Sequence, residues 1–243
     1  MRQDNLSQTS LSQDSLSGMI LIDKPAKITS FIAVHKVRKT LGVKKCGHCG
    51  TLDPFATGLL IIMTGKATKF QEKFMKQDKV YVADFLLGIT TDTCDITGTT
   101  ISEQDASHIT KLQVLKALRS FEGEIEQVPP MYSAIQHKGV RLYALARKGI
   151  EIERKARKVN IKKIELLSFK DSIARVYIEC SSGTYIRSIA GDLGKILGVG
   201  AVVSELRREK IGEFDVKDAV APKDLDNADL LKEKLILLMR LVF

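Results

Sequence analysis

The fold is decided by the stretch Gly47-His48-Cys49-Gly50-Thr51-Leu52-Asp53-Pro54 and by the apolar run that follows it, Gly58-Leu59-Leu60-Ile61-Ile62-Met63. The two glycines of the first stretch permit backbone angles that other residues avoid, and Pro54 pushes Asp53 out of the α region, so we expect a loop. The apolar run has the length of a buried strand. Asp53 is therefore expected on a stiff loop at the edge of a hydrophobic core. An enzyme can place a reactive acid there, although an aspartate before a proline is most often only a turn former.

The composition is that of a basic globular protein. Lysine and arginine outnumber the acids 38 to 29 in 243 residues, which gives a net charge of +9 and a pI near 9.3. This balance makes a polyanion the first partner to consider and favours RNA or DNA over a membrane surface. No apolar run approaches the ~20 residues that span a bilayer, and the N-terminus has no basic-then-apolar secretory signal. We therefore expect a cytoplasmic protein.

The chain has four cysteines, and two of them, Cys46 and Cys49, form a C-x-x-C motif. A redox site of this type needs the pair at the N-terminus of a helix, whereas Gly-Thr-Leu-Asp-Pro follows here. A structural zinc site needs a second close pair, and Cys94 and Cys180 lie far apart. Free thiols are therefore the first interpretation, with a redox or zinc site as the alternative.

The chain divides into three parts by composition. Residues 1–17 contain five serines and three glutamines and are expected to form a disordered tail. From 18 to about 215, strand-like and helix-like segments follow one another without an internal repeat or a strong linker, which favours one compact mixed α/β domain. Residues 216–243 are expected to form a C-terminal helical extension, with a last apolar helix over 230–243.

Apolar residues at helical spacing predict two further helices. The first is capped by Thr29 or Ser30 and has the stripe Phe31, Val34, Val37 and Leu41. The second has the stripe Leu112, Leu115, Leu118 and Phe121. Strands are predicted at 19–22, 79–87 and 176–180, and a polar loop or hairpin at 90–100.

Two basic segments stand out. Residues 154–163 hold six basic residues in ten, with alternating apolar positions, which is typical of an edge strand protected by charge. Four lysines fall on one stripe of a predicted helix, at Lys66, Lys69, Lys73 and Lys76. This lysine stripe is either a solvated face or a phosphate-binding surface.

The stretch around Asp53 also resembles the signature of the TruB family of tRNA pseudouridine synthases: Gly47-His48-x-Gly50-Thr51-Leu52-Asp53-Pro54-x-Ala56-x-Gly58-Leu59-Leu60, then Gly65-Lys66-Ala67-Thr68-Lys69. Further stretches agree in the family's order: Asp23-Lys24-Pro25 with Thr29-Ser30, Lys79-x-Tyr81, Asp92-Thr93-x-x-Asp95-x-x-Gly98, Pro129-Pro130-x-Tyr132-Ser133-Ala134, Leu142-Tyr143-x-x-Ala146-Arg147, Gly183-Thr184-Tyr185-Ile186-Arg187 and Leu206-Arg207-Arg208. Several spaced motifs in a fixed order are more specific than any one alone. The resemblance covers roughly 18–215. It implies a pseudouridine synthase-like catalytic domain with a single mixed, largely antiparallel sheet and flanking helices.

The resemblance implies an isomerase that converts a uridine in the T-loop of tRNA (position 55 by convention) to pseudouridine. The N1–C1′ glycosidic bond is broken, the uracil turns, and C5 is joined to C1′. The family uses neither a metal nor an organic cofactor. The expected partner is therefore tRNA, whose target base must be flipped out while basic segments hold the phosphates. We also expect a monomer.

Six residues match functional positions of the family. Asp53 matches the catalytic aspartate, which acts as nucleophile on the ribose or the uracil or assists glycosidic cleavage, and Arg187 matches the arginine that pairs with it. Tyr81 matches the tyrosine that stacks on the target base and can take the C5 proton. Tyr185 and Leu206 match residues that line the uracil pocket. His48 matches the histidine that holds the flipped nucleotide, where we expect binding rather than proton transfer.

Two positions depart from the family's pattern, because Cys49 stands where threonine is more usual and Lys27 where glycine is more usual. Many relatives carry a C-terminal RNA-binding module of the PUA type, and the residues after 215 are too few for one, so we expect a short form. Two other functions stay open: a non-catalytic RNA-binding or RNA-folding protein on the same scaffold, and a thiol oxidoreductase that uses Cys46 and Cys49.

Overall fold

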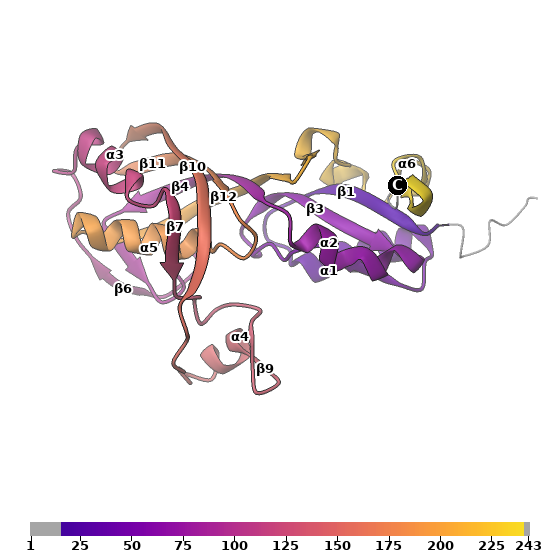
Figure 1. The fold of residues 1–243 in the computed structure, drawn as a ribbon, viewed down its shortest axis with the longest axis horizontal. Helices are drawn as coiled ribbons and strands as arrows, with labels where there is room; N and C mark the ends of the chain where they lie inside the picture. The colour runs from indigo at the N-terminus through magenta and orange to yellow at the C-terminus, as the bar shows by residue number, and fades with distance from the viewer. Residues whose placement is uncertain (1–15, 241–243) are drawn as a thin grey trace, which may run out of the picture.

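The computed structural model describes residues 16–240, and its centre is one twisted sheet (Figure 1). The strand order is β14-β1-β3-β12-β4-β11-β10-β7, with β2 paired to β3 and β13 to β12. These strands are β1 (Gly18–Lys24), β2 (Cys46–His48), β3 (Thr57–Thr64), β4 (Lys79–Leu87), β7 (Gly123–Gln127), β10 (Arg157–Lys170), β11 (Ile173–Cys180), β12 (Ala201–Ile211), β13 (Phe214–Asp215) and β14 (Ile236–Leu237). The pair β3–β12 is parallel, and the other pairs within this sheet are antiparallel. The expected mixed, largely antiparallel sheet with flanking helices is thus confirmed.

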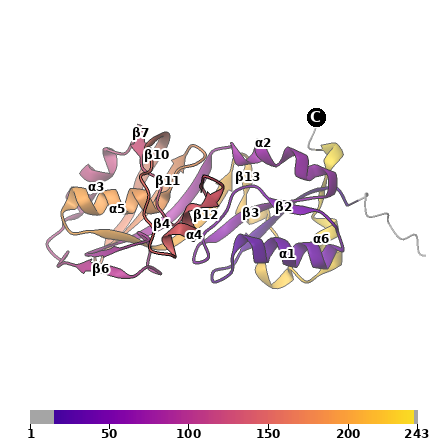
Figure 2. The same cartoon turned by 90° about the horizontal axis from the view of Figure 1, so that it is seen from below.

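The N-terminal half of the sheet is covered on both faces. Side chains of β1 and β3 alternate between the faces, because successive residues of a strand point to opposite sides. Ile20 and Leu60 pack under α1 (Ser30–Leu41) and α6 (Ala228–Glu233). Met19 and Ile61 pack on the other face, under η1 (Gly65–Phe70) and α2 (Gln71–Met75). Figure 2 shows α2 on one side of β3, with α1 and α6 on the other.

The other half carries its helices on one face. α3 (Lys111–Arg119) and α5 (Ile186–Leu197) pack against β4, β10, β11 and β12 through a core that includes Phe85, Val176 and Leu193. A hairpin of β5 (Ile89–Thr91) and β6 (Thr100–Glu103) leaves the end of β4, which fits the loop or hairpin predicted there. A separate excursion holds β8 (Gln136–His137), β9 (Val140–Arg141) and α4 (Leu142–Ala146), and it projects away from the sheet (Figure 1).

The predicted faces of two helices are wrong at their first turns. Thr29 caps α1, but Phe31 is 74% exposed, and the buried face is formed by Ala33, Val34, Val37 and Leu41. In α3, Leu112 is 75% exposed, while Val114 and Leu118 are buried. Both misplaced residues lie in the first turn of their helices, where no other segment of residues 16–240 covers them. The periodicity of apolar residues identifies one face of a helix, but it does not show which turns of that face the sheet covers.

Two further sequence predictions are wrong because strands that are far apart in the chain pair with each other. The basic segment 154–163 is no edge strand, since β10 lies between β11 and β7, and β7 pairs with Arg157–Ile161. No single helix spans the described part of 230–243. Instead α6 ends at Glu233, β14 pairs with β1, and a 3-10 turn, η4 (Leu238–Arg240), follows. Two other short 3-10 turns, η2 (Val216–Asp218) and η3 (Pro222–Asp224), connect β13 to α6.

Most of the predicted disordered tail, residues 1–15, lies outside the described residues. Its last two residues are packed. The Leu16 carbonyl accepts a hydrogen bond from Thr64 Oγ1 at 2.6 Å, and Ser17 Oγ accepts one from the Lys66 N–H at 3.0 Å. The ordered domain therefore begins at least two residues before Gly18.

We predict that Gly58→Ala destabilises the fold by at least about 3 kcal/mol. Gly58 has a φ of +104° and lies where β3 meets β12, and a Cβ there would come within 2.3 Å of the Arg208 carbonyl oxygen. The matched control is Gly42→Ala, at a φ of +65° with open space around the Cβ, for which backbone strain alone costs about 1 kcal/mol. Urea unfolding of the two variants measures the difference, and equal losses would contradict the close approach of β12.

Candidate active site

A cleft of about 520 Å³ opens where loops from the two halves of the sheet meet. One wall comes from the turn that starts α1 and from the loop after β2. The other comes from the β5–β6 connection, the segment before β8, the α4 excursion and the start of α5. The residues that line it include Phe31, His48, Asp53, Asp92, Asp95, Tyr132, Arg141, Tyr143, Arg147 and Arg187.

Asp53 and Arg187 meet in this cleft as a two-point ion pair. Arg187 Nε lies 2.9 Å from Asp53 Oδ2, and Arg187 Nη2 donates to Asp53 Oδ1 at 3.3 Å. The arginine side chain is 4% exposed, whereas that of the aspartate is 33% exposed. The guanidinium therefore fixes the plane of a carboxylate whose remaining surface faces the cleft.

Arg187 is itself held by three other groups. Its Nη1 donates to the Thr93 carbonyl at 3.0 Å, and its Nη2 donates to the Tyr132 carbonyl at 2.7 Å. A second carboxylate, Asp95, lies 3.5 Å from Nη1. Asp95 is 4% exposed, and its Oδ1 accepts hydrogen bonds from the hydroxyls of Thr93 at 2.9 Å and Thr97 at 2.6 Å. The guanidinium thus has no freedom to turn away from Asp53.

The loop that carries Asp53 is anchored from α1. Ser30 is 1% exposed, and its hydroxyl both donates to the Leu52 carbonyl at 3.1 Å and accepts from the Leu52 N–H at 2.8 Å. The Lys27 N–H donates to the Pro54 carbonyl at 2.8 Å, with Lys27 at a φ of +68°. That conformation favours glycine, which accounts for the family's usual residue at this position, and Lys27 adopts it at a cost in backbone strain.

Two buried cations hold the same loop from below the cleft surface. Lys24 is fully buried and donates through Nζ to the carbonyls of Pro25, Ile28 and Pro54. Arg208 is 1% exposed and donates to the carbonyls of Leu59 at 2.8 Å and Gly50 at 3.1 Å. The loop is therefore stiff, as the sequence predicted, but the stiffness comes from these cations as well as from glycine and proline.

The electrostatics of the cleft are set by burial and by these cations. Burial raises the pKa of the Asp53 carboxyl, and the Arg187 guanidinium opposes that rise. Burial lowers the pKa of Lys24 to about 8, and the Asp53 charge works against this. The pKa of His48 is lowered by burial and by the charges of Arg208 and Arg141, so its imidazole is neutral at neutral pH.

His48 is the third expected residue that the structure brings to the cleft. It ends β2, and its carbonyl accepts a hydrogen bond from Gln71 Nε2. Its Nδ1 is buried and has no hydrogen-bond partner among residues 16–240. A neutral imidazole whose Nδ1 has no partner is better suited to forming a hydrogen bond with a ligand than to stabilising a charge.

The other three expected residues do not line the cleft. Tyr81 and Leu206 are 8% and 7% exposed and belong to the hydrophobic core that also holds Leu52. Burial raises the pKa of the Tyr81 phenol, and the charge of Arg208, its cross-strand neighbour, lowers it. Tyr185 caps α5, and the Arg157 guanidinium carbon lies 4.8 Å from the centroid of its ring.

Sequence reasoning assigned no role to several residues that the cleft contains. Asp95, Tyr132, Tyr143 and Arg147 stand in motifs that the family resemblance had already singled out, so a signal for them existed, whereas Arg141 stands in none of these motifs. Arg141 and Tyr143 reach the cleft from the α4 excursion, and the Arg147 guanidinium carbon lies 5.4 Å from the centroid of the Tyr143 ring. Only the path of the chain brings these side chains opposite Asp53.

The cysteine alternatives find no support. The four cysteines are free, and burial raises the pKa of Cys46 to about 11 and that of Cys49 to about 12. A redox cysteine needs the opposite shift, toward the thiolate. Within residues 16–240, no cluster of histidine, cysteine, aspartate or glutamate could hold a metal, and no helix is long and apolar enough to cross a membrane.

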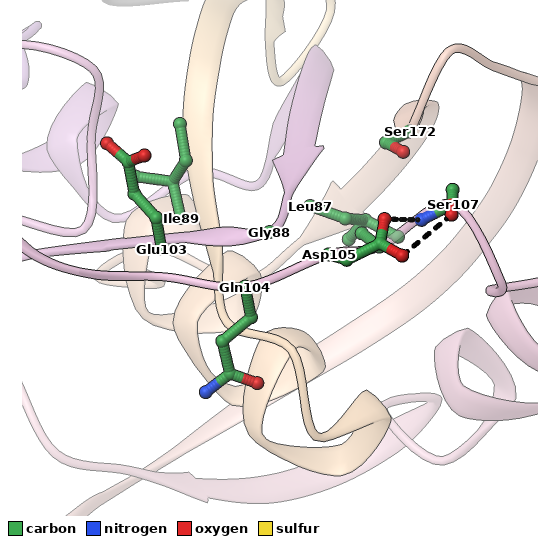
Figure 3. A pocket seen from close by; sticks show the side chains of 9 residues that line it. Leu87, Gly88, Ile89, Glu103, Gln104, Asp105, Ser107 and Ser172 are labelled. Atoms are coloured by element: carbon green, nitrogen blue, oxygen red, sulfur yellow. Dashed lines mark hydrogen bonds between the residues drawn. The ribbon is translucent and has the colours of Figure 1, made fainter.

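A second hollow of about 480 Å³ lies at the far end of β4 (Figure 3). Its polar centre is Asp105, whose two carboxylate oxygens accept hydrogen bonds from the N–H and the hydroxyl of Ser107 at 2.8 and 2.9 Å. None of the six expected functional residues lines it. The Asp53 cleft is therefore the candidate active site.

Comparison with known proteins shows the family of the chain. A model described as the TruB family pseudouridylate synthase N-terminal domain matches residues 38–186, and one described as the tRNA pseudouridylate synthase B C-terminal domain matches residues 187–242. The chain is 56% identical over 227 residues to "tRNA pseudouridine synthase B" of Endomicrobium trichonymphae, covering 93% of this chain and 99% of the relative. It is 46% identical to the protein of that name from Clostridium tetani, covering 88% and 74%.

Solved structures show the same fold. A chain of the "Crystal Structure of a Cbf5-Nop10-Gar1 Complex" superposes with a TM-score of 0.69 at 29% identity, covering 90% of this chain and 57% of that chain. A chain of the "Structure of H/ACA RNP bound to a substrate RNA containing 2'-deoxyuridine" superposes with a TM-score of 0.67 at 27% identity, covering 90% and 56%. From the two domain matches and the near full-length relative, we conclude that this chain belongs to the TruB family of pseudouridylate synthases.

Proposed function

We propose that this protein isomerises a uridine of tRNA to pseudouridine, and that its target is the T-loop uridine at position 55. The observation that carries the proposal is the Asp53–Arg187 pair, an oriented carboxylate that faces a cleft large enough for a flipped nucleotide. The TruB family membership and the curated relatives support the reaction. The T-loop position rests on the resemblance of the Asp53 stretch to the family signature.

The reaction conserves the elemental composition of the uridine, while the hydrogen on C5 is lost to water and replaced by a proton on N1. The N1–C1′ bond breaks, C5 forms a bond to C1′, the C5 proton leaves, and N1 gains a proton. No electron is supplied or removed. The protein therefore has to stabilise the separated sugar and base, hold the base while it turns, and move one proton.

Asp53 is the proposed nucleophile or electrostatic partner in bond cleavage. Attack on the ribose, attack on the uracil, and stabilisation of a cationic ribose all require the ionised carboxylate. Arg187 favours that ionised form through its charge and its two contacts, against the effect of burial. Asp95 completes the arrangement, because it holds the guanidinium from its other side.

The remaining roles are carried over from the family resemblance. His48 lines the cleft, its buried Nδ1 has no partner within residues 16–240, and the residue is proposed to hold the flipped nucleotide. Tyr81 is proposed to stack on the uracil and take the C5 proton, and Arg208 is the charge that opposes the effect of burial on its phenol. Tyr185 and Leu206 are proposed to line the uracil pocket. Since Tyr81 and Leu206 are nearly buried, RNA binding must open the core beside Leu52.

The phosphate contacts are proposed to come mainly from the lysine stripe rather than from the basic strand. In β10 and the segment before it, Arg154, Lys158, Lys162 and Lys163 already form ion pairs with acids. In the lysine stripe, Lys69 and Lys73 are exposed, on η1 and α2. Within residues 16–240 the structure shows no ion pair for these two lysines, so they can contact phosphates without first breaking one.

We also propose that the catalytic domain of 18–215 works with its C-terminal extension as one unit, as a cytoplasmic monomer on tRNA. β12 lies between β3 and β4, so the sheet needs residues from both regions matched by the family models. The extension closes the same sheet, because β14 pairs with β1.

Asp53→Asn is expected to lower the reaction rate by about a thousandfold or more, because the amide can neither attack as a nucleophile nor neutralise a cation. Release of tritium from tRNA transcripts labelled at uridine C5 measures it. Asp84→Asn is the matched control, since Asp84 pairs with Arg175 on the sheet and does not line the cleft. Release by the wild type but also by Asp53→Asn would remove Asp53 from the chemistry. No release by the wild type from any tRNA, with binding intact, would favour an RNA-binding protein.

Arg187→Gln is expected to move the acid limb of the pH profile to higher pH. The folded pKa of Asp53 lies above its ordinary value, so activity that needs the carboxylate is present above that pKa and lost as the pH falls through it. Removing the guanidinium removes an interaction that lowers the pKa, so the loss begins at higher pH. The profile of kcat/KM for tritium release measures the shift, with Arg175→Gln as control. An unmoved limb would show that another group titrates.

Lys69→Gln and Lys73→Gln are each expected to reduce the slope of log Kd against log salt for tRNA by about one. The physical reason is that each phosphate contact releases condensed counterions. Filter binding over a range of salt concentrations measures the slope. Lys116→Gln on α3, at the opposite end of the sheet from α2 (Figure 1), is the control. An unchanged slope in both variants would make the lysine stripe a solvated face.

A further inference from the structure

Phe31 is an exposed aromatic residue in the first turn of α1. Its side chain is 74% exposed and that of the next residue, Ile32, is 49% exposed, although α1 buries its apolar face from Ala33 onward. A singly exposed apolar residue is common on protein surfaces, so the place of this ring, and not its exposure alone, carries the argument. Phe31 also lines the same cleft as Asp53.

The backbone holds Phe31 at a fixed place relative to the catalytic loop. The residue before it, Ser30, makes two hydrogen bonds to Leu52, the residue before Asp53. Thr29 caps the helix by accepting from the Ile32 N–H at 3.1 Å. Phe31 therefore stands on a rigid turn that cannot move independently of the carboxylate, which is how a preorganised contact residue is mounted.

The surroundings of the ring indicate the chemistry of its partner. Arg141, Tyr143 and Arg147 line the same cleft from the α4 excursion, and Lys27 is exposed two residues before the cap of α1. Aromatic rings interleaved with cations are typical of surfaces that bind single-stranded nucleic acid, because bases stack on the rings while the cations meet phosphates. An apolar peptide would leave these cations without partners.

The exposed fractions of Phe31 and Asp53 also indicate that the base held by Phe31 is not the target base. The Asp53 side chain is 33% exposed and faces the cleft, while Phe31 is 74% exposed. A base held against the ring therefore lies at the outer edge of the cleft while the reacting uridine is at the carboxylate. One aromatic face at the edge suits a neighbouring base that has lost its stacking partner to flipping.

We propose that Phe31 is a stacking platform for a second, unpaired base of the RNA substrate, adjacent to the uridine that enters the cleft. The inference rests on the proposed function for the identity of the RNA. It adds a binding residue that acts on recognition of the flipped loop rather than on bond cleavage. The platform replaces the stacking energy that the loop loses when the target uridine leaves.

The test compares Phe31→Ala, Phe31→Leu and Phe31→Tyr with the wild type. Unmodified tRNA transcript is the probe, Kd is measured by filter binding, and kcat is measured by tritium release at saturating RNA. Leu112→Ala is the matched control, because Leu112 is equally exposed in the first turn of α3 and does not line the cleft. Thermal unfolding of each variant checks that the fold is intact.

Stacking predicts that Phe31→Ala raises Kd at least fivefold, with a smaller effect on kcat, and that Phe31→Tyr recovers most of the affinity. Phe31→Leu should stay close to Phe31→Ala, because an aliphatic side chain offers no ring. Equal affinity in wild type and Phe31→Ala would overturn the inference, and so would full affinity in Phe31→Leu. A wild type that binds tRNA but releases no tritium would refute the proposed reaction alone, since the Kd comparison does not depend on turnover.

Discussion

The ion pair between Arg187 and Asp53 is the interaction on which the candidate active site depends. It joins residues 134 positions apart in the chain and links the loop after β2 to the start of α5. Burying such a pair costs desolvation, and the cost is offset only when the geometry is good and the remaining hydrogen bonds are made. Here the carbonyls of Thr93 and Tyr132 and the carboxylate of Asp95 satisfy the guanidinium. Three loops are thereby held in one arrangement around a carboxylate that faces solvent on one side.

The strand β12 makes that pair possible, because it connects the two halves of the sheet. It runs antiparallel to β4 and meets β3 in parallel for only two residues, Arg207 and Arg208. Arg208 reaches through this junction to the carbonyls of the Asp53 loop, and Gly58 leaves room for its backbone. The fold thus places the Asp53 loop beside the one pair of neighbouring strands in the described sheet that run parallel. Rigidity at that point positions the carboxylate, while the α4 excursion brings arginines to the other wall.

Part of this arrangement could be predicted from the sequence, and the limit is physical. The strand at Thr57–Thr64, the loop before it and the cap at Thr29 follow from residues that are near one another in the chain. The pairing of Asp53 with Arg187 was predicted only through the family resemblance, because no local pattern encodes a contact of that range. Asp95 was missed as a partner although its motif was noted. The basic strand β10 was misplaced at an edge, since its alternation of charged and apolar residues does not reveal that β7 pairs with it.

The amino-acid sequence was enough to predict most strands, loops and helices in the core of the domain, the place of Asp53 on a loop before a buried strand, and the family that the chain resembles. These properties depend on local backbone preferences and on short motifs. Long-range packing set which side chains share the cleft, placed Tyr81 and Leu206 in the core beside it, and left Phe31 facing solvent. The physical reason is that burial is a property of neighbours. An apolar residue at helical spacing is buried only if another segment reaches it, and that depends on pairings far apart in the chain.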